Sequence, residues 1–595
     1  MSGWYERWRR ILGPLLGVIV IVLALLVHPL DTVPELRVCA DPVTVNVVSS
    51  TEKAGPLATL ADRYNAAAHD PEIRCGEIRV HKVSSGIAEE LLADPDHQDA
   101  AISEADRAAV RSAHVWAPSS VVWLEQLDLD SRSGYGQRPV RSLAASPLVL
   151  AMTEATAGPL GWLDRPPTWR QAMDALGDDL FYTQENPRTS TSGAMATFLT
   201  YAAAAAGDGE LAPATLTAEG LPSLSGFVRT VQSAAKGGFL NDSVEILRGW
   251  NQSANIPANT MIMVQEQMVY GFNDGLFPRY LDSRQTGRKP EVPLVAIHPV
   301  GPSGMAESIV ADHPWVPLDT AGDDEKAIAE HFLSYVMKNW NVLCDAGFRS
   351  PVGNGSVGCA PARPGETAVV SLPLPDGTVR SEMVRRWLDL RSKRRITIAM
   401  DVSGSMRDER LREATRAVAD GVGLMRPTDQ VEIFQFAGTE SHRSPYWSIR
   451  DLADVGTGWA AEAARLGSAP RDETLTKRSS VHTTVRDLYD RVAARHASGG
   501  GGTLDVLIVL SDGVNDWNDG ISDAAVCAHL KKNRVDVPVH TIHYDPGIYS
   551  AEQQRDGAAA LEQYANCSGV SGQAAESSSN SQALRNIMSQ VLGSA

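Results

Sequence analysis

Apolar strands alternate with amphipathic helices along most of the chain. Val43–Val48 has the composition of a buried strand, and a polar turn leads from it to an amphipathic helix over Lys53–Ala68. Ile78–Val83 and Ile87–Ala93 repeat this strand, polar turn and helix. Such repetition predicts an α/β fold with mainly parallel strands.

The pattern divides the chain into two structured blocks. The first covers residues 43–352. A Gly- and Pro-rich stretch and a helix over residues 381–393 follow it, so we predict that residues 353–393 connect the blocks. The second block covers residues 394–595 and contains four apolar runs that predict strands, at residues 396–400, 431–436, 505–511 and 537–544.

Composition excludes several functional classes. The 595 residues carry 54 Lys and Arg against 72 Asp and Glu, a net charge of -18. An acidic chain lacks the basic surface that phosphate backbones require, so nucleic acid is not expected as a general partner. The mean hydropathy of -0.16 excludes a protein with many membrane spans.

One membrane anchor is nevertheless predicted near the N-terminus. Residues 11–27 carry no charge and are just long enough to cross a bilayer. Arg7, Arg9 and Arg10 precede them, so the positive-inside rule places residues 1–10 in the cytoplasm and the rest of the chain outside it. We therefore expect a single-pass protein of the cell membrane with a signal anchor over residues 11–30. A cleaved signal peptide is the alternative, but no small-residue cleavage site follows the apolar run.

All six cysteines lie beyond this predicted anchor. An even number outside the cytoplasm predicts disulfide bonds rather than metal ligation, because no two cysteines have the spacing of a zinc site. Sequential pairing closes one loop in each of three regions, and it would join Cys39 to Cys75, Cys344 to Cys359 and Cys527 to Cys567.

The strongest chemical signal lies at the start of the second block. The apolar run at residues 396–400 ends in Asp401-Val402-Ser403-Gly404-Ser405, and a helical pattern follows it. One carboxylate and two hydroxyls thus lie in a turn at the carboxyl end of a strand, where open α/β sheets bind ligands. Oxygen ligands suit Mg²⁺, or alternatively Mn²⁺ or Ca²⁺. The same residues could instead form an ordinary turn that caps a helix.

This block resembles a von Willebrand factor type A domain, whose metal-ion-dependent adhesion site carries the Asp-x-Ser-x-Ser signature. The order of the strands and the Ser-Asp-Gly sequence at residues 511–513 agree with that family. The resemblance implies a Rossmann-like fold in which Ser403 and Ser405 bind the metal directly. It also implies that Asp401 and Asp512 bind the metal or hold its water molecules.

The family also uses a threonine from a separate loop as a metal ligand. Thr484, just before the predicted helix at residues 485–497, is the first candidate and Thr483 is the alternative. In the family, a carboxylate from a partner completes the coordination of the metal. The resemblance therefore implies metal-dependent binding of a protein or surface ligand, as in adhesion, rather than catalysis.

The first block offers several hydroxyl-rich turns between strands and helices. Residues 187–193 precede a helix at residues 194–206, and the free N–H groups and dipole of a helix N-terminus favour an anion or a polar oxygen. Similar turns could place further hydroxyls in one cleft. The candidate ligand-binding residues are Ser49, Ser50, Ser84, Ser85, Thr189, Ser190, Thr191 and Ser192. All of them could instead be helix N-caps.

The first block resembles a bacterial extracellular solute-binding protein of the type II periplasmic-binding class. The residues that carry the resemblance are spread over residues 44–65, 115–127, 142–152, 185–204 and 310–319. The resemblance implies two lobes around a cleft that holds a small solute or anion.

No catalytic constellation appears in the sequence, and nothing around Ser403 resembles a nucleophile elbow. We therefore expect a binding protein and not an enzyme. The leading interpretation is a membrane-anchored extracytoplasmic protein that binds a protein or surface ligand through its metal site. The alternative is a receptor that captures a solute in the N-terminal cleft for transport or sensing.

Overall fold

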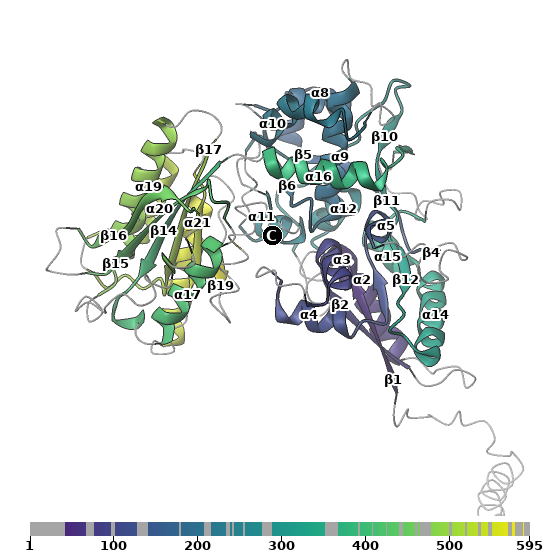
Figure 1. Ribbon diagram of the computed structural model, residues 1–595, viewed down its shortest axis with the longest axis horizontal. Helices are drawn as coiled ribbons and strands as arrows, with labels where there is room; N and C mark the ends of the chain where they lie inside the picture. The colour runs from purple at the N-terminus through teal and green to yellow at the C-terminus, as the bar shows by residue number, and fades with distance from the viewer. Residues whose placement is uncertain are drawn as a thin grey trace, which may run out of the picture.

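A computed structural model places most of the chain beyond residue 41. It describes residues 42–66, 76–96, 102–127, 141–177, 180–206, 216–233, 239–240, 243–253, 256, 258–276, 288–351, 367–390, 393–406, 409–423, 425–438, 444–456, 459, 462–463, 478–498, 503–517, 520–532, 537–544, 550–568, 574–576 and 587. These residues form two α/β lobes in the N-terminal module and one further α/β unit, the C-terminal module (Figure 1).

The first lobe is built on a five-stranded sheet in the order β2-β1-β3-β12-β4. Its strands are β1 (Val43–Ser49), β2 (Gly76–Lys82), β3 (Val115–Ala117), β4 (Arg141–Ser142) and β12 (Pro314–Pro317). Its helices are α2 (Thr51–Ala66), α3 (Ser85–Ala93), α4 (Glu104–Arg111), α5 (Val122–Gln126), α14 (Asp323–Lys338) and α15 (Asn341–Asp345). Apolar residues of β1, α2 and α14 form one core, because each element turns its apolar side to the same layer.

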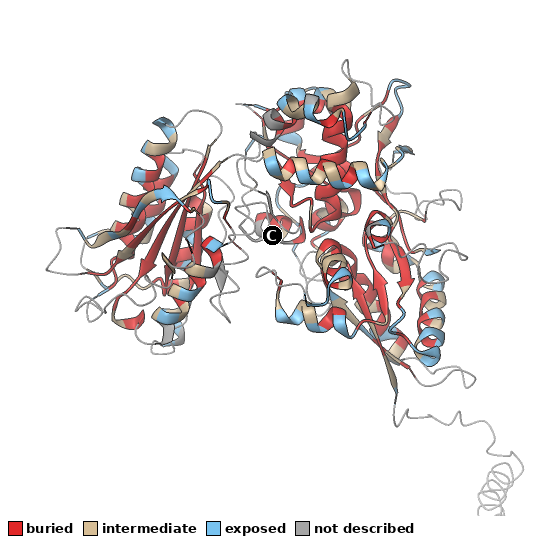
Figure 2. Cartoon of the chain, in the orientation of Figure 1, coloured by how far each residue is buried: buried red, intermediate tan, exposed pale blue. Residues whose placement is uncertain are grey.

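The second lobe is built on the sheet β11-β5-β8-β6-β7, to which β9 adds by pairing with β5. Its strands are β5 (Ser146–Thr153), β6 (Phe181–Glu185), β7 (Phe239–Leu240), β8 (Thr260–Gln265), β9 (Leu294–Ile297) and β11 (Val310–Ala311). Its helices are α7 (Glu154–Ala157), α8 (Trp169–Asp174), α9 (Thr191–Ala206), η3 (Leu221–Leu224), α10 (Ser225–Ser233), α11 (Ser243–Ser253) and α12 (Glu266–Asn273). The first 13 residues of α9 are buried because α9 lies in the middle of this lobe (Figure 2).

The strand directions differ from the sequence prediction. β1 pairs in parallel with β2 and β3, as expected, but β12 runs antiparallel to β3, and β5 runs antiparallel to β8, β9 and β11. The expectation of mainly parallel strands in the first block is therefore wrong, and the two sheets are mixed. The chain enters β5 and β12 from the other lobe, so no helical crossover within one lobe forces these strands to be parallel.

The segment predicted to connect the two blocks packs on the N-terminal module. It contains β13 (Val369–Ser371), which pairs with β10 (Ala306–Ser308), and α16 (Gly377–Leu390). Met383 and Trp387 of α16 are fully buried in the core that contains α9. The buried Arg380 donates a hydrogen bond to Glu125 of α5, in the first lobe. This helix therefore contacts both lobes.

The C-terminal module has a six-stranded sheet in the order β16-β15-β14-β17-β18-β19, in which only β16 pairs antiparallel. Its strands are β14 (Lys393–Asp401), β15 (Gln430–Phe436), β16 (Tyr446–Asp454), β17 (Thr503–Ser511), β18 (Val539–His543) and β19 (Ala574–Glu576). Its helices are η4 (Gly404–Met406), α17 (Glu409–Gly423), α19 (Val481–Ser498), α20 (Asp523–Lys532) and α21 (Ala551–Cys567). One core lies between the sheet and α17, and a second lies between the sheet and α19, α20 and α21. The sheet is therefore covered on both faces, which suits its continuous apolar strands.

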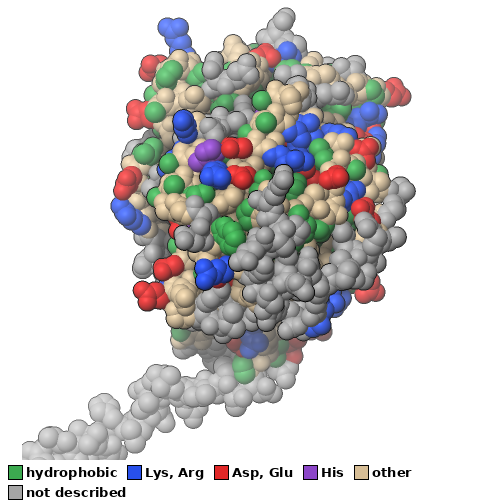
Figure 3. All heavy atoms as spheres, turned by 90° about the vertical axis from the view of Figure 1, so that its left-hand side faces the viewer, with side chains coloured by type: hydrophobic (Ala, Val, Ile, Leu, Met, Phe, Trp, Pro, Cys, Tyr) green, Lys and Arg blue, Asp and Glu red, His purple; other side chains and the backbone are tan. Residues whose placement is uncertain are grey.

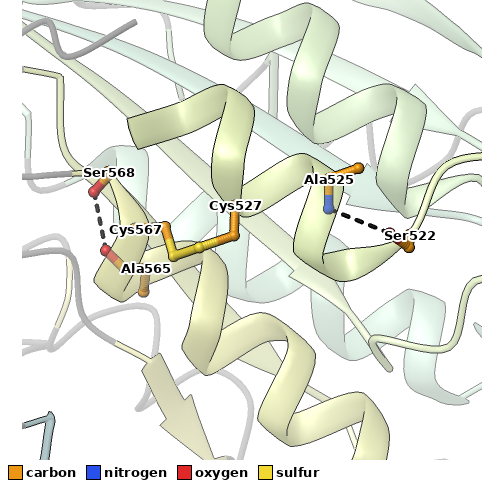
Figure 4. The surroundings of a disulfide bond; sticks show 6 residues. All are labelled: Ser522, Ala525, Cys527, Ala565, Cys567 and Ser568. Atoms are coloured by element: carbon orange, nitrogen blue, oxygen red, sulfur yellow. Dashed lines mark hydrogen bonds between the residues drawn. A yellow bond between two sulfur atoms is a disulfide. The ribbon is translucent and has the colours of Figure 1, made fainter. Parts of the chain in front are cut away.

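A disulfide joins α20 to α21 (Figure 4). Cys527 and Cys567 are 40 residues apart in the sequence, and sequential pairing predicts this bond. Cys344 is also disulfide-bonded, to a partner outside the described residues. Cys39, Cys75 and Cys359 lie outside the described residues as well.

Two further features concern the surface and the membrane. No helix in the described part of the chain is both long and apolar enough to cross a bilayer. The predicted anchor at residues 11–27 lies outside that part. On the face shown in Figure 3, acidic and basic side chains are interspersed, so the charge there does not form a field of one sign.

Candidate functional site

The Asp-x-Ser-x-Ser residues lie at the carboxyl end of the central strand of the C-terminal sheet. Asp401 is the last residue of β14, and Ser403 and Ser405 follow in the turn that contains η4. Asp512 directly follows β17, the parallel neighbour of β14. Parallel strands that end at the same sheet edge bring these four residues together. All four are buried, and Asp401 and Asp512 are fully inaccessible to solvent.

Hydrogen bonds fix the Asp401 carboxylate. Its Oδ1 accepts from the backbone N–H of Ser403 at 2.9 Å, and its Oδ2 accepts from the hydroxyls of Ser511 and Ser479, each at 2.7 Å. The Ser403 and Ser405 hydroxyl oxygens are 3.0 Å apart. Four hydroxyl groups and one carboxylate from three segments of the chain thus form a connected cluster of oxygen atoms.

The structure places Ser479, which the sequence analysis did not consider, against Asp401. Thr484 lies one helical turn further on, and its Oγ1 is 3.4 Å from the Ser480 hydroxyl. Asp516 supports Ser479 by accepting a hydrogen bond from its backbone N–H at 2.5 Å. Ser479 therefore joins the candidate ligand set as a further hydroxyl from the separate loop, and Thr484, with Thr483 as its alternative, stays a prediction. A signal was present in the sequence, because Ser479-Ser480 directly precedes the helix.

Burial and mutual repulsion make the two carboxylates unusual. Burial raises the pKa of Asp401, although hydrogen bonds from Ser403, Ser511 and Ser479 oppose the rise. Burial, and next the charge of Asp401, raise the pKa of Asp512 to about 7, against the hydrogen bonds from Ser405 and the Val514 N–H. Asp512 Oδ2 is buried and has no hydrogen-bond partner. A bound cation would offset the repulsion between these two buried carboxylates and so stabilise their ionised forms.

The donor set fits a hard divalent cation. The ligating atoms on offer are all oxygens, from Asp401, Ser403, Ser405, Ser479 and Asp512. Mg²⁺ and Ca²⁺ prefer oxygen ligands, whereas Zn²⁺ is usually bound by nitrogen and sulfur. Among the residues that the structure describes, no group of three or more His, Cys, Asp or Glu side chains could hold a metal. A cation here would thus be bound by two carboxylates and by hydroxyls, and it would have to complete its coordination with water or a ligand.

A second candidate site lies between the two lobes of the N-terminal module. A small pocket opens where β1, β6 and β8 end and α2, α3, α9 and α11 begin; its enclosed space is about 10 Å³, and about 250 Å³ when the open solvent at its mouth is included. Its lining is polar and consists of Thr51, Glu52, Ser84, Ser85, Ser119, Glu185, Thr189, Ser190, Thr191, Ser192, Ser243 and Gln265.

Six of the eight hydroxyl residues predicted for a ligand cleft line this pocket. The other two, Ser49 and Ser50, are buried in the wall, where Ser50 donates to Glu52 Oε1 at 2.9 Å. Sequence reasoning missed the acidic and amide residues of the lining, Glu52, Glu185 and Gln265. Glu185 and Gln265 are the last residues of β6 and β8, and Glu52 is the second residue of α2, so their position at the edge of a sheet was the available signal.

The lobes touch each other beside this pocket, at the segment that leads into α9. The Gly86 N–H donates to Thr189 O at 2.9 Å, and Trp123 Nε1 donates to Thr191 Oγ1 at 2.8 Å. Arg188 and Glu90 form an ion pair at 2.5 Å. Each contact joins one lobe to the other, so the cleft is closed in this structure.

Comparisons with known proteins give likeness of fold only. No family model matches the sequence, and no curated protein does. One similar solved structure is the sulfate-binding protein SubI from Mycobacterium tuberculosis H37Rv, with 13% identity and a TM-score of 0.35 over 52% of this chain and 88% of that one. A periplasmic thiamin binding protein has 11% identity and a TM-score of 0.37 over 58% of this chain and 95% of that one.

A von Willebrand factor type A protein from Catenulispora acidiphila is also similar in structure. It shares 11% identity at a TM-score of 0.25, over 34% of this chain and 42% of that one. The structural neighbours thus include periplasmic solute-binding proteins and a von Willebrand factor type A protein.

Proposed function

We propose that this protein binds a protein or surface ligand through a divalent cation held in its C-terminal module. Mg²⁺ is the first candidate for this cation. The observation that carries the proposal is the convergence of Asp401, Ser403, Ser405, Ser479 and Asp512, which leaves the buried Asp512 Oδ2 without a hydrogen-bond partner. With few carboxylates in its shell, the cation keeps a high affinity for a further carboxylate. A carboxylate of the partner would supply it, as the resemblance to the adhesion-site family implies.

The proposal describes binding and not catalysis. It includes a membrane anchor at residues 11–30 that holds both modules outside the cytoplasm. In that arrangement the metal site meets partners beyond the membrane, and adhesion or assembly is the role that such a site serves.

Calorimetry with Mg²⁺ on the full chain tests the proposal. Asp401→Ala removes the carboxylate at the centre of the cluster, so we expect it to abolish the binding heat that the wild type shows. Asp454→Ala is the matched control, because Asp454 is an exposed carboxylate at the far end of β16, bonded to Lys393. Equal Mg²⁺ binding by the wild type and Asp401→Ala would contradict the site.

A second function is favoured by a separate observation. The closed pocket between the two lobes is lined by hydroxyl and carboxylate groups, and Thr189 Oγ1 and Gln265 Oε1 are buried there without hydrogen-bond partners. We propose that the N-terminal module captures a small solute in this pocket. A thermal-shift screen of anions and small solutes tests it, and the absence of any stabilisation would leave the module a structural role.

A further inference from the structure

The first-lobe wall of the pocket carries a buried carboxylate. Glu52 lies in the first turn of α2, is only 5% exposed and lines the pocket. The hydroxyls of Ser50 and Ser119 both donate to its Oε1. Thr51 donates to its Oε2 at 3.4 Å, which is a weak bond. Glu52 Oε1 thus already accepts two hydrogen bonds from the protein, whereas Oε2 can still accept a strong hydrogen bond from a ligand.

No cation of the wall presents its charge to the pocket. The Lys53 ammonium is fully buried and donates to Ser50 Oγ, Ala117 O and Pro118 O, at 2.7, 2.7 and 3.0 Å. Three acceptors use all three of its N–H bonds. His313 lies 3.8 Å from Glu52, but burial lowers its pKa well below the ordinary value, so its ring is neutral. Among the described lining residues there is neither lysine nor arginine.

The second-lobe wall adds further hydrogen-bond acceptors. Glu185 is 3% exposed and accepts a hydrogen bond from Ser190. Gln265 Oε1 is buried and makes no hydrogen bond. A buried acceptor without a donor lowers stability, so a ligand that donates an N–H or O–H group to it would regain that free energy on binding.

The same pocket also favours negative oxygen atoms. α2, α3 and α9 all begin at it, so the positive ends of three helix dipoles meet there, although the Gly86 N–H of α3 donates to Thr189 O and the Gly193 N–H of α9 donates to Ser190 Oγ. The Thr189 hydroxyl is buried there without a partner. A fully ionised oxyanion would satisfy these donors but would meet the carboxylates. A simple cation would satisfy the carboxylates but would meet the helix dipoles. A ligand that carries both an ammonium group and a carboxylate satisfies both sets.

We propose that the cleft binds a small zwitterion of amino-acid type, with its ammonium group on Glu52 and Gln265 and its carboxylate at the helix N-termini. This inference rests on the proposed solute-binding function and names the chemical class of the solute. It also makes the sequence expectation of an anion more specific, because a fully ionised oxyanion such as sulfate would meet the carboxylates of Glu52 and Glu185.

Calorimetry on the full chain separates the ligand classes. The probes are glycine and L-serine as zwitterions, methylammonium and acetate as their two halves, and sulfate as an oxyanion, each at up to about 10 mM. We expect at least one zwitterion to bind at least about tenfold more tightly than any other probe, and Glu52→Gln to weaken it at least about tenfold. Glu104→Gln, at an exposed position of α4 outside the pocket, should leave the affinity unchanged.

Gln265→Met provides a second variant that keeps the size of the side chain. It removes an acceptor that has no partner in the protein, so the fold should persist while the affinity for the zwitterion falls. Tighter binding of sulfate than of either zwitterion, strengthened further by Glu52→Gln, would overturn the zwitterion but leave solute binding intact. Failure of all five probes would also overturn the zwitterion, and a blank thermal-shift screen would then overturn solute binding itself.

Discussion

Ser479 donates a hydrogen bond to Asp401 from a loop that is 78 residues away in the sequence, with 2.7 Å between Oγ and Oδ2. This bond joins the start of α19 to the end of β14 and completes the ring of oxygen atoms around the proposed cation.

Ser479→Ala is expected to weaken Mg²⁺ binding about 10–100-fold, because groups that ligate or orient metal ligands contribute on that scale. Calorimetry of the full chain measures the change. Thr484→Val is the control, since it removes the buried hydroxyl beside Ser480 and keeps the shape of the side chain. A larger loss in Thr484→Val than in Ser479→Ala would identify Thr484, and not Ser479, as the ligand.

Asp512→Asn is expected to have opposite effects with and without metal. In EDTA at pH 7 it should stabilise the C-terminal module by about 2 kcal/mol, because it removes one of two buried carboxylates that repel each other. It should also abolish stabilisation by Mg²⁺. Scanning calorimetry measures both effects. Asp454→Asn, at an exposed position, should change neither, and a destabilised Asp512→Asn protein in EDTA would show that the carboxylates are compensated without metal.

Acid is expected to destabilise the C-terminal module through His540. This histidine of β18 is fully buried, and burial lowers its pKa to about 4. Below pH 6.5 the unfolded chain takes up a proton that the folded chain refuses, so stability falls as the pH drops from 6.5 toward 4. The loss between pH 7 and pH 5 should be about 2 kcal/mol from this residue. Urea unfolding of wild type and His540→Gln at both pH values measures it, and equal pH dependence of the two proteins would exclude His540 as the cause.

Removal of the Cys527–Cys567 disulfide is expected to destabilise the C-terminal module. The bond closes a loop over a sequence separation of 40 residues, which corresponds to about 3–4 kcal/mol in the chain-entropy model. The double variant Cys527→Ala/Cys567→Ala should therefore unfold at a lower temperature in calorimetry. Reducing agent should lower the midpoint of the wild type and leave that transition of the double variant unchanged.

Gly86→Ala is expected to hold the N-terminal cleft open. A Cβ atom at Gly86 would lie 2.0 Å from Arg188 O and 2.7 Å from Thr189 Cα, which are backbone atoms of the other lobe. The lobes must then separate, so the radius of gyration from X-ray scattering should rise and solute binding should weaken. Gly177→Ala is the control because nothing lies within 4 Å of its added Cβ. An unchanged radius with unchanged affinity would mean that the lobes do not close through this contact.

The sequence predicted elements whose pattern is local. The apolar runs that become β14, β15 and β17 are buried on both faces, so composition alone identified them. β16 was missed because this edge strand is mostly half-buried or exposed, and its residues lack a continuous apolar run. The direction of β5 could not be predicted either, because it depends on how the chain passes between the lobes.

The residues of the metal site also divide into those that a local sequence pattern predicts and those that depend on tertiary packing. Asp401, Ser403, Ser405 and Asp512 lie at the ends of strongly apolar strands, and their proximity follows from parallel pairing. Ser479 comes from a loop whose path is set by tertiary packing, so only the structure shows its contact with Asp401.

The position of α16 determines how a mechanical load would travel through the molecule. Leu390 ends α16 and Lys393 begins β14, so the joint between the modules spans at most about 11 Å. Tension applied at Asp401 would pass along β14, whose hydrogen bonds to β15 and β17 are loaded together in shear, and then into a helix held by the buried Trp387. Force from a bound partner would therefore reach the core of the N-terminal module directly, with no slack linker to absorb it.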